Sequence, residues 1–188
     1  MSIKREGSYP RAGAIMVKKY IASLAIAGAA AAALANVAVA TPASPNVVGT
    51  VWARAGFADS VDITLRVRDG RGHHGKREVI HVRQAGDTVM QQIVLGPGGH
   101  TGWHSHPGPA IALVKSGELT LYSADDPTCM GRPFGLGQAF VDSGQGHVHI
   151  ARNLTNDPTE VWVTYLDVPP GGAPRIDAAD PGTCRYLF

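Results

Sequence analysis

The chain has 188 residues, which is enough for one domain with a substantial core and hardly enough for two. It carries 17 lysines and arginines against 15 aspartates and glutamates. Five of the basic residues and one acidic residue lie in the first forty positions, which leaves 12 basic and 14 acidic residues in the remainder. This balance excludes a basic stripe with interleaved aromatic residues, so we do not expect nucleic acid as a partner.

A secretory signal peptide is indicated at the start of the chain. Lys18 and Lys19 form a positively charged region, an alanine-rich apolar run follows, and the run ends in small residues up to Ala40. We therefore expect residues 1–40 to be a leader cleaved after about Ala40, with Met16 as an alternative start, and the mature protein to be secreted or periplasmic. A membrane anchor is disfavoured because the run is rich in alanine, and no later segment has the roughly 20 apolar residues that span a bilayer.

The rest of the chain has the pattern of short β-strands. Residues 41–60 contain Pro and turn-forming residues, and we expect an extended N-terminal segment there. Later segments alternate apolar and polar residues between Gly, Pro, Asp and Asn, without a helical period, which predicts an all-β sandwich or barrel over 61–168. The polar loop 69–78, with His73 and His74, is expected to be an exposed hairpin loop. The predicted strands cover 61–69, 77–83, 87–95, 109–115, 117–123, 137–142, 146–153 and 160–168.

The chain has two cysteines, Cys129 and Cys184, and both follow the predicted cleavage site. An even number of cysteines in an exported chain favours one disulfide. Such a bond would close a loop of about 55 residues and could stabilise the fold by on the order of 4 kcal/mol. It would also tie the tail, residues 169–188, to the barrel. Two free thiols or a role in metal binding are the alternatives.

Two of the predicted strands carry histidines in pairs. His104 and His106 flank one residue, and His147 and His149 do the same about 40 positions later. Because side chains alternate between the two faces of a strand, the members of each pair point to the same face. The two pairs can approach one ion only if both strands line the interior of a barrel. Imidazole ligands suit Fe, Mn, Zn, Ni or Cu.

These two segments resemble the motifs of the cupin superfamily. The first motif of that family is a Gly, five residues, H-x-H, three or four residues, Glu, six residues and Gly, and the second leads to G-x-x-H-x-x-x-N. Both occur here in order, at the separation of a single cupin domain, over about residues 85–168. The glutamate position falls on Ala110, and Gly144 stands where a proline is usual. The matching residues are Gly98, His104, His106 and Gly117 in the first motif and Gly146, His149 and Asn153 in the second.

The resemblance implies a cupin jelly-roll-like β-barrel, with antiparallel strands in two sheets and a divalent transition metal held by His104, His106 and His149. Ala110 cannot supply the glutamate that usually completes the ligand set. Three alternatives follow. In the first, three histidines bind the ion and water fills its remaining coordination positions. In the second, another side chain takes the place of the glutamate, with His147 as the best candidate. In the third, the site no longer binds metal.

Several neighbouring residues are expected to have scaffold roles. Trp103 faces away from the histidines, so we expect it to pack on the outside of the sheet or in an oligomer contact. His100 is expected at the rim of the site, and His81 in the core or at a sheet edge. Asn153 should cap a turn through its side chain, and Gly117 should form a tight turn.

No conventional catalytic nucleophile is evident, because the chain lacks a G-x-S-x-G elbow, a phosphate-binding loop and a dinucleotide fingerprint. We predict no specific catalytic residue. The expected function is an exported single-domain cupin that binds a divalent metal and acts on a small molecule, as an oxygenase- or isomerase-like enzyme. The alternatives are a non-catalytic cupin that binds a metal or small ligand, and, less favoured, a purely structural exported protein. A homodimer is an option that the sequence leaves open.

Overall fold

The computed structural model describes residues 39–68, 77–184 and 186, which lie within one compact unit. The predicted signal peptide, apart from its last two residues, and the loop histidines His73 and His74 lie outside the described residues. The described residues form strands and no helix, and therefore none that could cross a membrane. The strands are β1 (Val47–Ala55), β2 (Ile63–Arg68), β3 (Arg77–Val82), β4 (Asp87–Leu95), β5 (His104–Ser105), β6 (Ala110–Ser116), β7 (Glu118–Ser123), β8 (Arg132–Gly135), β9 (Ala139–Asp142), β10 (His149–Arg152), β11 (Thr159–Val168) and β12 (Ile176–Asp177).

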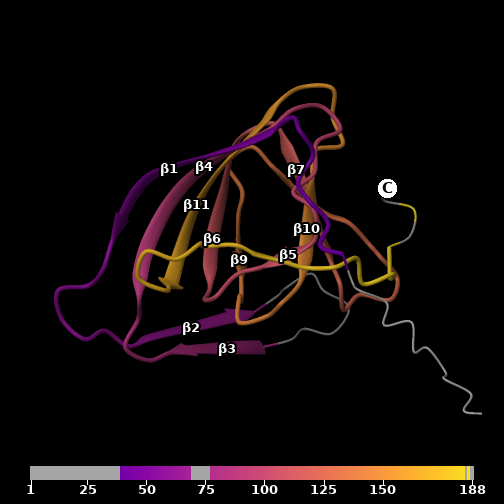
Figure 1. The fold of residues 1–188 in the computed structure, drawn as a ribbon. Coiled ribbons are helices and arrows are strands. Elements are labelled where there is room, and N and C mark those ends of the chain that lie inside the picture. The colour runs from indigo at the N-terminus through magenta and orange to yellow at the C-terminus, as the bar shows by residue number, and fades with distance from the viewer. Residues whose placement is uncertain (1–38, 69–76, 185, 187–188) are drawn as a thin grey trace, which may run out of the picture. The chain divides into compact units, whose positions relative to one another are not determined.

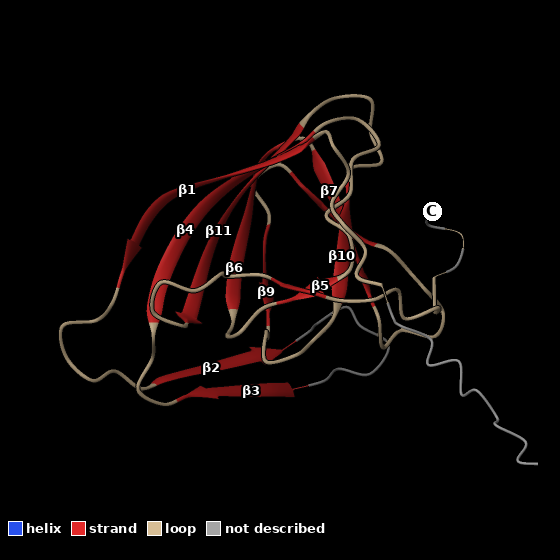
Figure 2. Cartoon of the chain, in the orientation of Figure 1, coloured by secondary structure: helices blue, strands red, loops and turns tan. Residues whose placement is uncertain are grey.

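Two antiparallel sheets of five strands form the body of the fold (Figure 1). The first has the order β1-β4-β11-β6-β9, and the second has the order β12-β5-β10-β7-β8. Eight strands, β4 to β11, are divided between the sheets so that β4-β11-β6-β9 lies across from β5-β10-β7-β8, which is the strand order of a jelly roll made of two Greek keys. The predicted all-β, antiparallel, double-sheet fold is confirmed, and Figure 2 shows how loops link the strands of the two sheets.

The N-terminal segment that was predicted to be extended contains a strand of the first sheet. β1 lies within residues 41–60 and pairs along its length with β4. It is an edge strand exposed on both sides over most of its length, so it lacks the alternation that marks the inner strands. β2 and β3 pair only with each other in a separate two-stranded sheet, although they lie within the range predicted for the barrel, 61–168.

The core lies between the two sheets and is made of the inward members of alternating strands. Val89 and Leu95 come from β4, Val161 from β11, and Leu119 and Phe134 from the opposite sheet. Each is at most 5% exposed. Burial of a side chain of this size stabilises a fold by about 1.5–3 kcal/mol, which makes the barrel a rigid frame for groups that point inward.

A second apolar cluster covers the outer side of the second sheet. Trp103, Tyr122 and Ile150 lie there with Cys129 and Cys184, which form the predicted disulfide. Trp103 is 0% exposed, and its carbonyl oxygen accepts a hydrogen bond from the tail. The expectation that Trp103 packs outside the sheet is therefore confirmed, whereas the alternative of an oligomer contact is wrong, because this chain itself covers the indole.

Loss of the disulfide should measurably destabilise the fold. Replacing Cys129 and Cys184 by serine is expected to lower the free energy of unfolding by about 2–5 kcal/mol, because the bond restricts the unfolded chain and both sulfurs are buried. Urea unfolding with and without reductant measures the effect, and reductant should change the wild type but not the double variant. Identical unfolding curves for the wild type under both conditions would contradict the prediction.

Candidate metal site

His104, His106 and His149 come together on the inner side of the second sheet. His104 of β5 is directly paired with His149 of β10, and His106 follows β5 on the same face. The three rings have centroids 4.4–5.1 Å apart, and one ligand nitrogen from each lies within 4.8 Å of the others. All three residues are buried. This is the group of residues that the two motifs indicated, and its spacing is compatible with a single ion.

Two rings of this group, those of His104 and His106, are held in place by oxygen acceptors. His104 Nδ1 lies 2.8 Å from the carbonyl oxygen of Gly102, and His106 Nδ1 lies 2.7 Å from that of Pro174. A carbonyl oxygen can only accept, so both Nδ1 atoms carry the proton and both Nε2 atoms keep a free lone pair. Metal-binding histidines commonly have such a partner on the other nitrogen, which sets the tautomer and orients the ring.

Burial also keeps the imidazoles of His104 and His106 neutral. Desolvation lowers the pKa of His104 well below its ordinary value, and the neighbouring His149 and Arg175 lower it further. Desolvation and His149 lower the pKa of His106 to about 4. A metal ion binds only the neutral imidazole, so at neutral pH these side chains are in the form that a metal requires.

A buried carboxylate that the motifs did not indicate lies beside the histidines. Asp142 is the last residue of β9, is 4% exposed and pairs across the sheet with Ala110. Its Oδ2 lies 2.8 Å from His147 Nδ1 and 3.2 Å from His149 Nδ1, although the latter pair is not aligned for a hydrogen bond. The barrel therefore has an acidic side chain one strand away from the position where the cupin glutamate would stand.

The charge of Asp142 is secured by its neighbours. Burial would raise the pKa of this carboxyl, but the hydrogen bond from His147 and the proximity of His149 hold the pKa far below its ordinary value. The backbone N–H of Gly144 donates to the other oxygen over 2.9 Å. The only sequence signal for this position is that Asp142 lies two residues after Phe140, which packs against the core, and so on the same face of the strand.

His147 lies in a different group from His104 and His106. It precedes β10, is partly exposed, and joins Asp142 and His149 in a second set of closely spaced ligand atoms. Its Nε2 lies 2.7 Å from Ser123 Oγ. The hydrogen bond to Asp142 raises the pKa of His147. The structure thus links His147 to the three histidines through Asp142 and His149.

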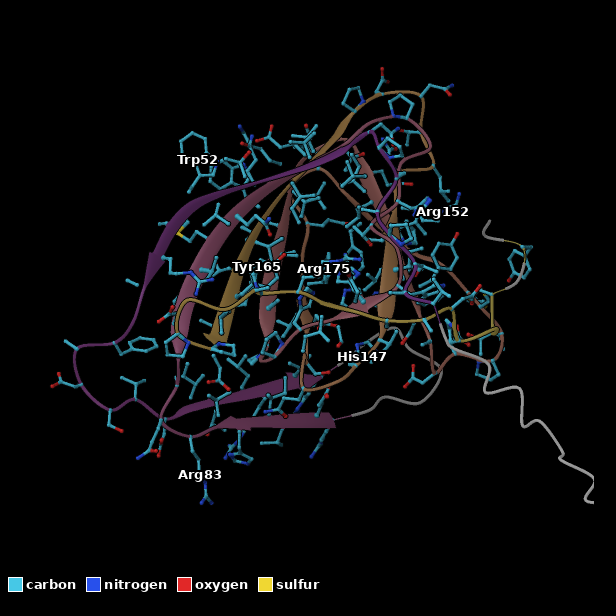
Figure 3. All side chains as sticks on the ribbon, viewed as in Figure 1. Trp52, Arg83, His147, Arg152, Tyr165 and Arg175 are labelled. Atoms are coloured by element: carbon cyan, nitrogen blue, oxygen red, sulfur yellow. A yellow bond between two sulfur atoms is a disulfide. The ribbon has the colours of Figure 1, made fainter. Side chains whose placement is uncertain are left out.

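A small cavity of about 40 Å³ adjoins the histidine group. Its polar lining consists of the three histidines, Asp142, Tyr165 and Thr101, and the remainder is apolar. The Tyr165 ring lies 4.9 Å from that of His106, and burial raises the pKa of its hydroxyl, so the hydroxyl stays protonated (Figure 3). Sites for drug-sized ligands occupy about 300–1,000 Å³, so this space suits an ion with a ligand of a few atoms.

The other motif residues have structural roles. Asn153 is fully buried, and its Oδ1 accepts a hydrogen bond from the N–H of Thr155, which confirms the predicted turn cap. Gly117 has a φ of +73°, and a Cβ there would lie 2.6 Å from Thr159 Oγ1, so the tight turn between β6 and β7 requires glycine. His81 lies on the exposed face of β3, within the two-stranded sheet, and is an edge histidine.

His100 is half-buried beside this group rather than within it. Its Nδ1 accepts a hydrogen bond from the N–H of Gly102, and its own N–H donates to Ser44 Oγ. The same Gly102 supplies the carbonyl oxygen that holds His104. His100 therefore helps to shape the turn that leads into the histidine pair.

The buried imidazoles predict a loss of stability in mild acid. With EDTA present, His106 takes up a proton near pH 6.5 when unfolded but only near pH 4 when folded, which should cost on the order of 3 kcal/mol of stability at pH 4. His147 has a raised pKa, so its contribution is complete below pH 6.5 and is lost only as pH rises through its folded pKa. Urea unfolding between pH 7 and pH 4 measures this, and a flat profile would contradict it.

Comparison with known proteins gives similarity at the level of structure. No family model and no curated protein matches the chain. Similar solved structures include the polyketide cyclase RemF from Streptomyces resistomycificus (21% identity, 50% of this chain and 64% of that chain, TM-score 0.40). An uncharacterized conserved protein with a double-stranded beta-helix domain from Klebsiella pneumoniae is 20% identical (64% of this chain, 85% of that chain, TM-score 0.39). The Cupin_2 domain of an XRE family transcriptional regulator from Enterobacter cloacae is 23% identical (44% and 82%, TM-score 0.35).

Two of these neighbours are described as a double-stranded beta-helix protein and a Cupin_2 domain, and all three are less than 25% identical to this chain. The chain spans slightly less than two thirds of the length of RemF. The similarity concerns the fold and assigns no activity.

Proposed function

We propose that this jelly-roll barrel is a cupin-type protein that binds one divalent transition metal ion through Nε2 of His104, His106 and His149. The observation that carries the proposal is the state of these side chains: buried, close together, and with Nδ1 of His104 and His106 already occupied by carbonyl oxygens. Three protein ligands leave positions on an ion for water or a small molecule. Of the alternatives left open by Ala110, this arrangement supports the first, a three-histidine site with open positions.

Asp142 takes a supporting role in this proposal. A carboxylate that faces the Nδ1 of a metal-bound histidine fixes its tautomer and makes its Nε2 a stronger ligand. Asp142 Oδ2 lies 3.2 Å from His149 Nδ1, which is close enough for that role although the pair is not aligned for a hydrogen bond, and His147 neutralises part of its charge. The barrel thus contains a carboxylate close to the position of Ala110, but in this proposal it contacts His149 and does not bind the ion itself.

A bound ion would supply Lewis acidity and a place for a small molecule, including dioxygen. The chain would supply an apolar lining that excludes water and a neutral Tyr165 hydroxyl that can donate a hydrogen bond. These features support metal-dependent chemistry on a small molecule, with an oxygenase-like reaction as the first candidate. The small cavity favours a second candidate, a carrier that holds the metal or a small ligand without turnover.

Elemental analysis tests the proposal. Mature protein purified without a histidine tag should contain close to one transition metal ion per chain, and dialysis against a chelator should remove it without unfolding the barrel. Absence of metal from protein expressed with Fe, Mn, Zn, Ni and Cu available would reject the proposal. An activity that disappears with the chelator and returns with the metal would distinguish an enzyme from a carrier.

We infer in addition that the protein is exported. The predicted leader and the disulfide between Cys129 and Cys184, which is typical of an oxidising compartment, support this inference. Mass spectrometry of the mature protein should place the new N-terminus close to residue 41, and recovery of the uncleaved chain from the cytosol would reject it.

A further inference from the structure

The C-terminal tail forms part of the wall around the histidine group. β12 pairs with β5, so that Ile176 lies opposite Ser105 and Asp177 opposite His104. The carbonyl oxygen of Pro174 holds His106 in place. The tail, coloured yellow in Figure 1, crosses beside β5 and is joined to the fold by the disulfide at Cys184. Arg175 lies between two tail residues that contact the histidine strand, so its backbone position is fixed.

The Arg175 side chain lacks one of its acceptors. Its Nε donates to Asp177 Oδ1 over 2.5 Å, which orients the guanidinium group. Its Nη2 is buried and has no hydrogen-bond partner among the described residues. A buried charged donor without an acceptor is costly, and this cost disappears when an acceptor arrives.

The charge of the guanidinium group also affects residues of the candidate metal site. Its positive charge contributes to the low pKa of His104 and His106, and it opposes part of the rise that burial causes in the pKa of Tyr165. In the view of Figure 3, Arg175 and Tyr165 are labelled next to each other. The charge is therefore felt at the site, although the Arg175 backbone belongs to the tail.

The charges around the site favour binding of an anion. His104 and His106 are neutral. Two carboxylates lie nearby and both already have partners: Asp142 faces His147 and His149, and Asp177 accepts from Arg175 Nε. A divalent ion would thus leave an excess of positive charge at the site. Arg175 lies outside the cavity lining, but its Nη2 still lacks an acceptor. The free space of about 40 Å³ limits the anion to a few atoms. A planar carboxylate suits both a metal ion and a guanidinium group, whereas a phosphate is bulkier.

We propose that Arg175 anchors a small carboxylate, such as formate or a short carboxylic acid, whose other oxygen faces the ion held by His104, His106 and His149. This inference rests on the proposed function, because it requires the ion. It assigns the specificity of the site to a residue outside both motifs. In this role Arg175 is a substrate-binding residue and not a metal ligand.

The test uses mature, disulfide-bonded protein loaded with Co(II), whose visible absorption changes when its ligands change. Formate is titrated at constant ionic strength into the wild type, Arg175→Gln and a control, Arg66→Gln, which removes an exposed arginine from the separate two-stranded sheet. Loss of one charge-assisted hydrogen bond should weaken formate binding about tenfold to a hundredfold in Arg175→Gln, with no change in Arg66→Gln. Arg175→Lys should bind formate with intermediate affinity, because it keeps the charge without the guanidinium group.

The outcomes separate the two proposals. If all variants bind Co(II) and Arg175→Gln binds formate as tightly as the wild type, the anchor is rejected and the metal site stands. If neutral formamide loses as much affinity as formate in Arg175→Gln, the anion assignment is rejected. Binding of phosphate in preference to formate would overturn the commitment to a carboxylate. If the wild type binds no Co(II), the proposed function and the anchor fail together. If Arg175→Gln unfolds, Arg175→Lys is compared with the wild type instead. Formate binding by Arg175→Lys that is as tight as in the wild type rejects the proposed role of Arg175.

Discussion

The His149→Ala variant is expected to remain folded and to lose its metal. His149 is one of three ligands in the proposed site and lies between the other two rings and Asp142. Loss of a residue that hydrogen-bonds to a metal ligand commonly weakens metal binding by about 10–100-fold. Loss of the ligand itself should therefore weaken binding by more than about a hundredfold. Competition with a chromophoric chelator measures the affinity, and elemental analysis gives the metal content.

His81→Ala is the matched control for this experiment. His81 lies on the exposed face of β3, in the two-stranded sheet that pairs with neither sheet of the barrel, and it is not in the histidine group, so its removal should leave metal content unchanged. Equal metal affinity in His149→Ala and His81→Ala would show that the ion, if one is bound, lies elsewhere. Circular dichroism of the β-rich spectrum separates this outcome from unfolding.

Removal of Asp142 should affect stability more strongly than removal of any other carboxylate in the described part of the chain. The carboxylate of Asp142 is buried between His147 and His149. The Asp142→Ala change removes the hydrogen-bond partner that raises the pKa of His147. Breaking a buried pair in this way typically costs about 3–5 kcal/mol. Metal affinity should fall by about 10–100-fold as well, because His149 loses the group that faces its Nδ1.

Asp125→Ala provides the comparison for that variant. Asp125 also approaches His147, at 3.9 Å, but its side chain is 67% exposed, so the expected loss is below about 1 kcal/mol. Urea unfolding at pH 7 compares the two variants. If Asp142→Ala is within 1 kcal/mol of Asp125→Ala, the buried carboxylate does not have the structural role assigned to it.

The part of the site that could be predicted depends on local periodicity. The alternation of side chains along a strand places His104 and His106 on one face, and it needs no knowledge of the rest of the fold. The resemblance to the cupin motifs then implies that His149 joins them, and the register of β10 with β5 places His149 opposite His104. Asn153 and Gly117 were predictable for the same reason, because turn chemistry is local.

The part that escaped prediction depends on contacts between distant segments. Asp142 reaches the histidines only because β9 pairs with β6, so that Asp142 lies beside Ala110, and no local pattern specifies that register. The carbonyl oxygen of Pro174 and the guanidinium group of Arg175 reach the site through a tail that β12 and the disulfide hold in place. The edge strand β1 was missed because exposure on both faces removes the alternation that identifies a strand.

Anomalous diffraction at a metal absorption edge, on crystals of the mature protein grown with the metal that elemental analysis identifies, tests the central claim most directly. We expect one anomalous peak, at about 2.0–2.3 Å from Nε2 of His104, His106 and His149, with no protein oxygen as a fourth ligand. A peak ligated by Asp142 and His147, or no peak between the two sheets, would contradict the three-histidine site.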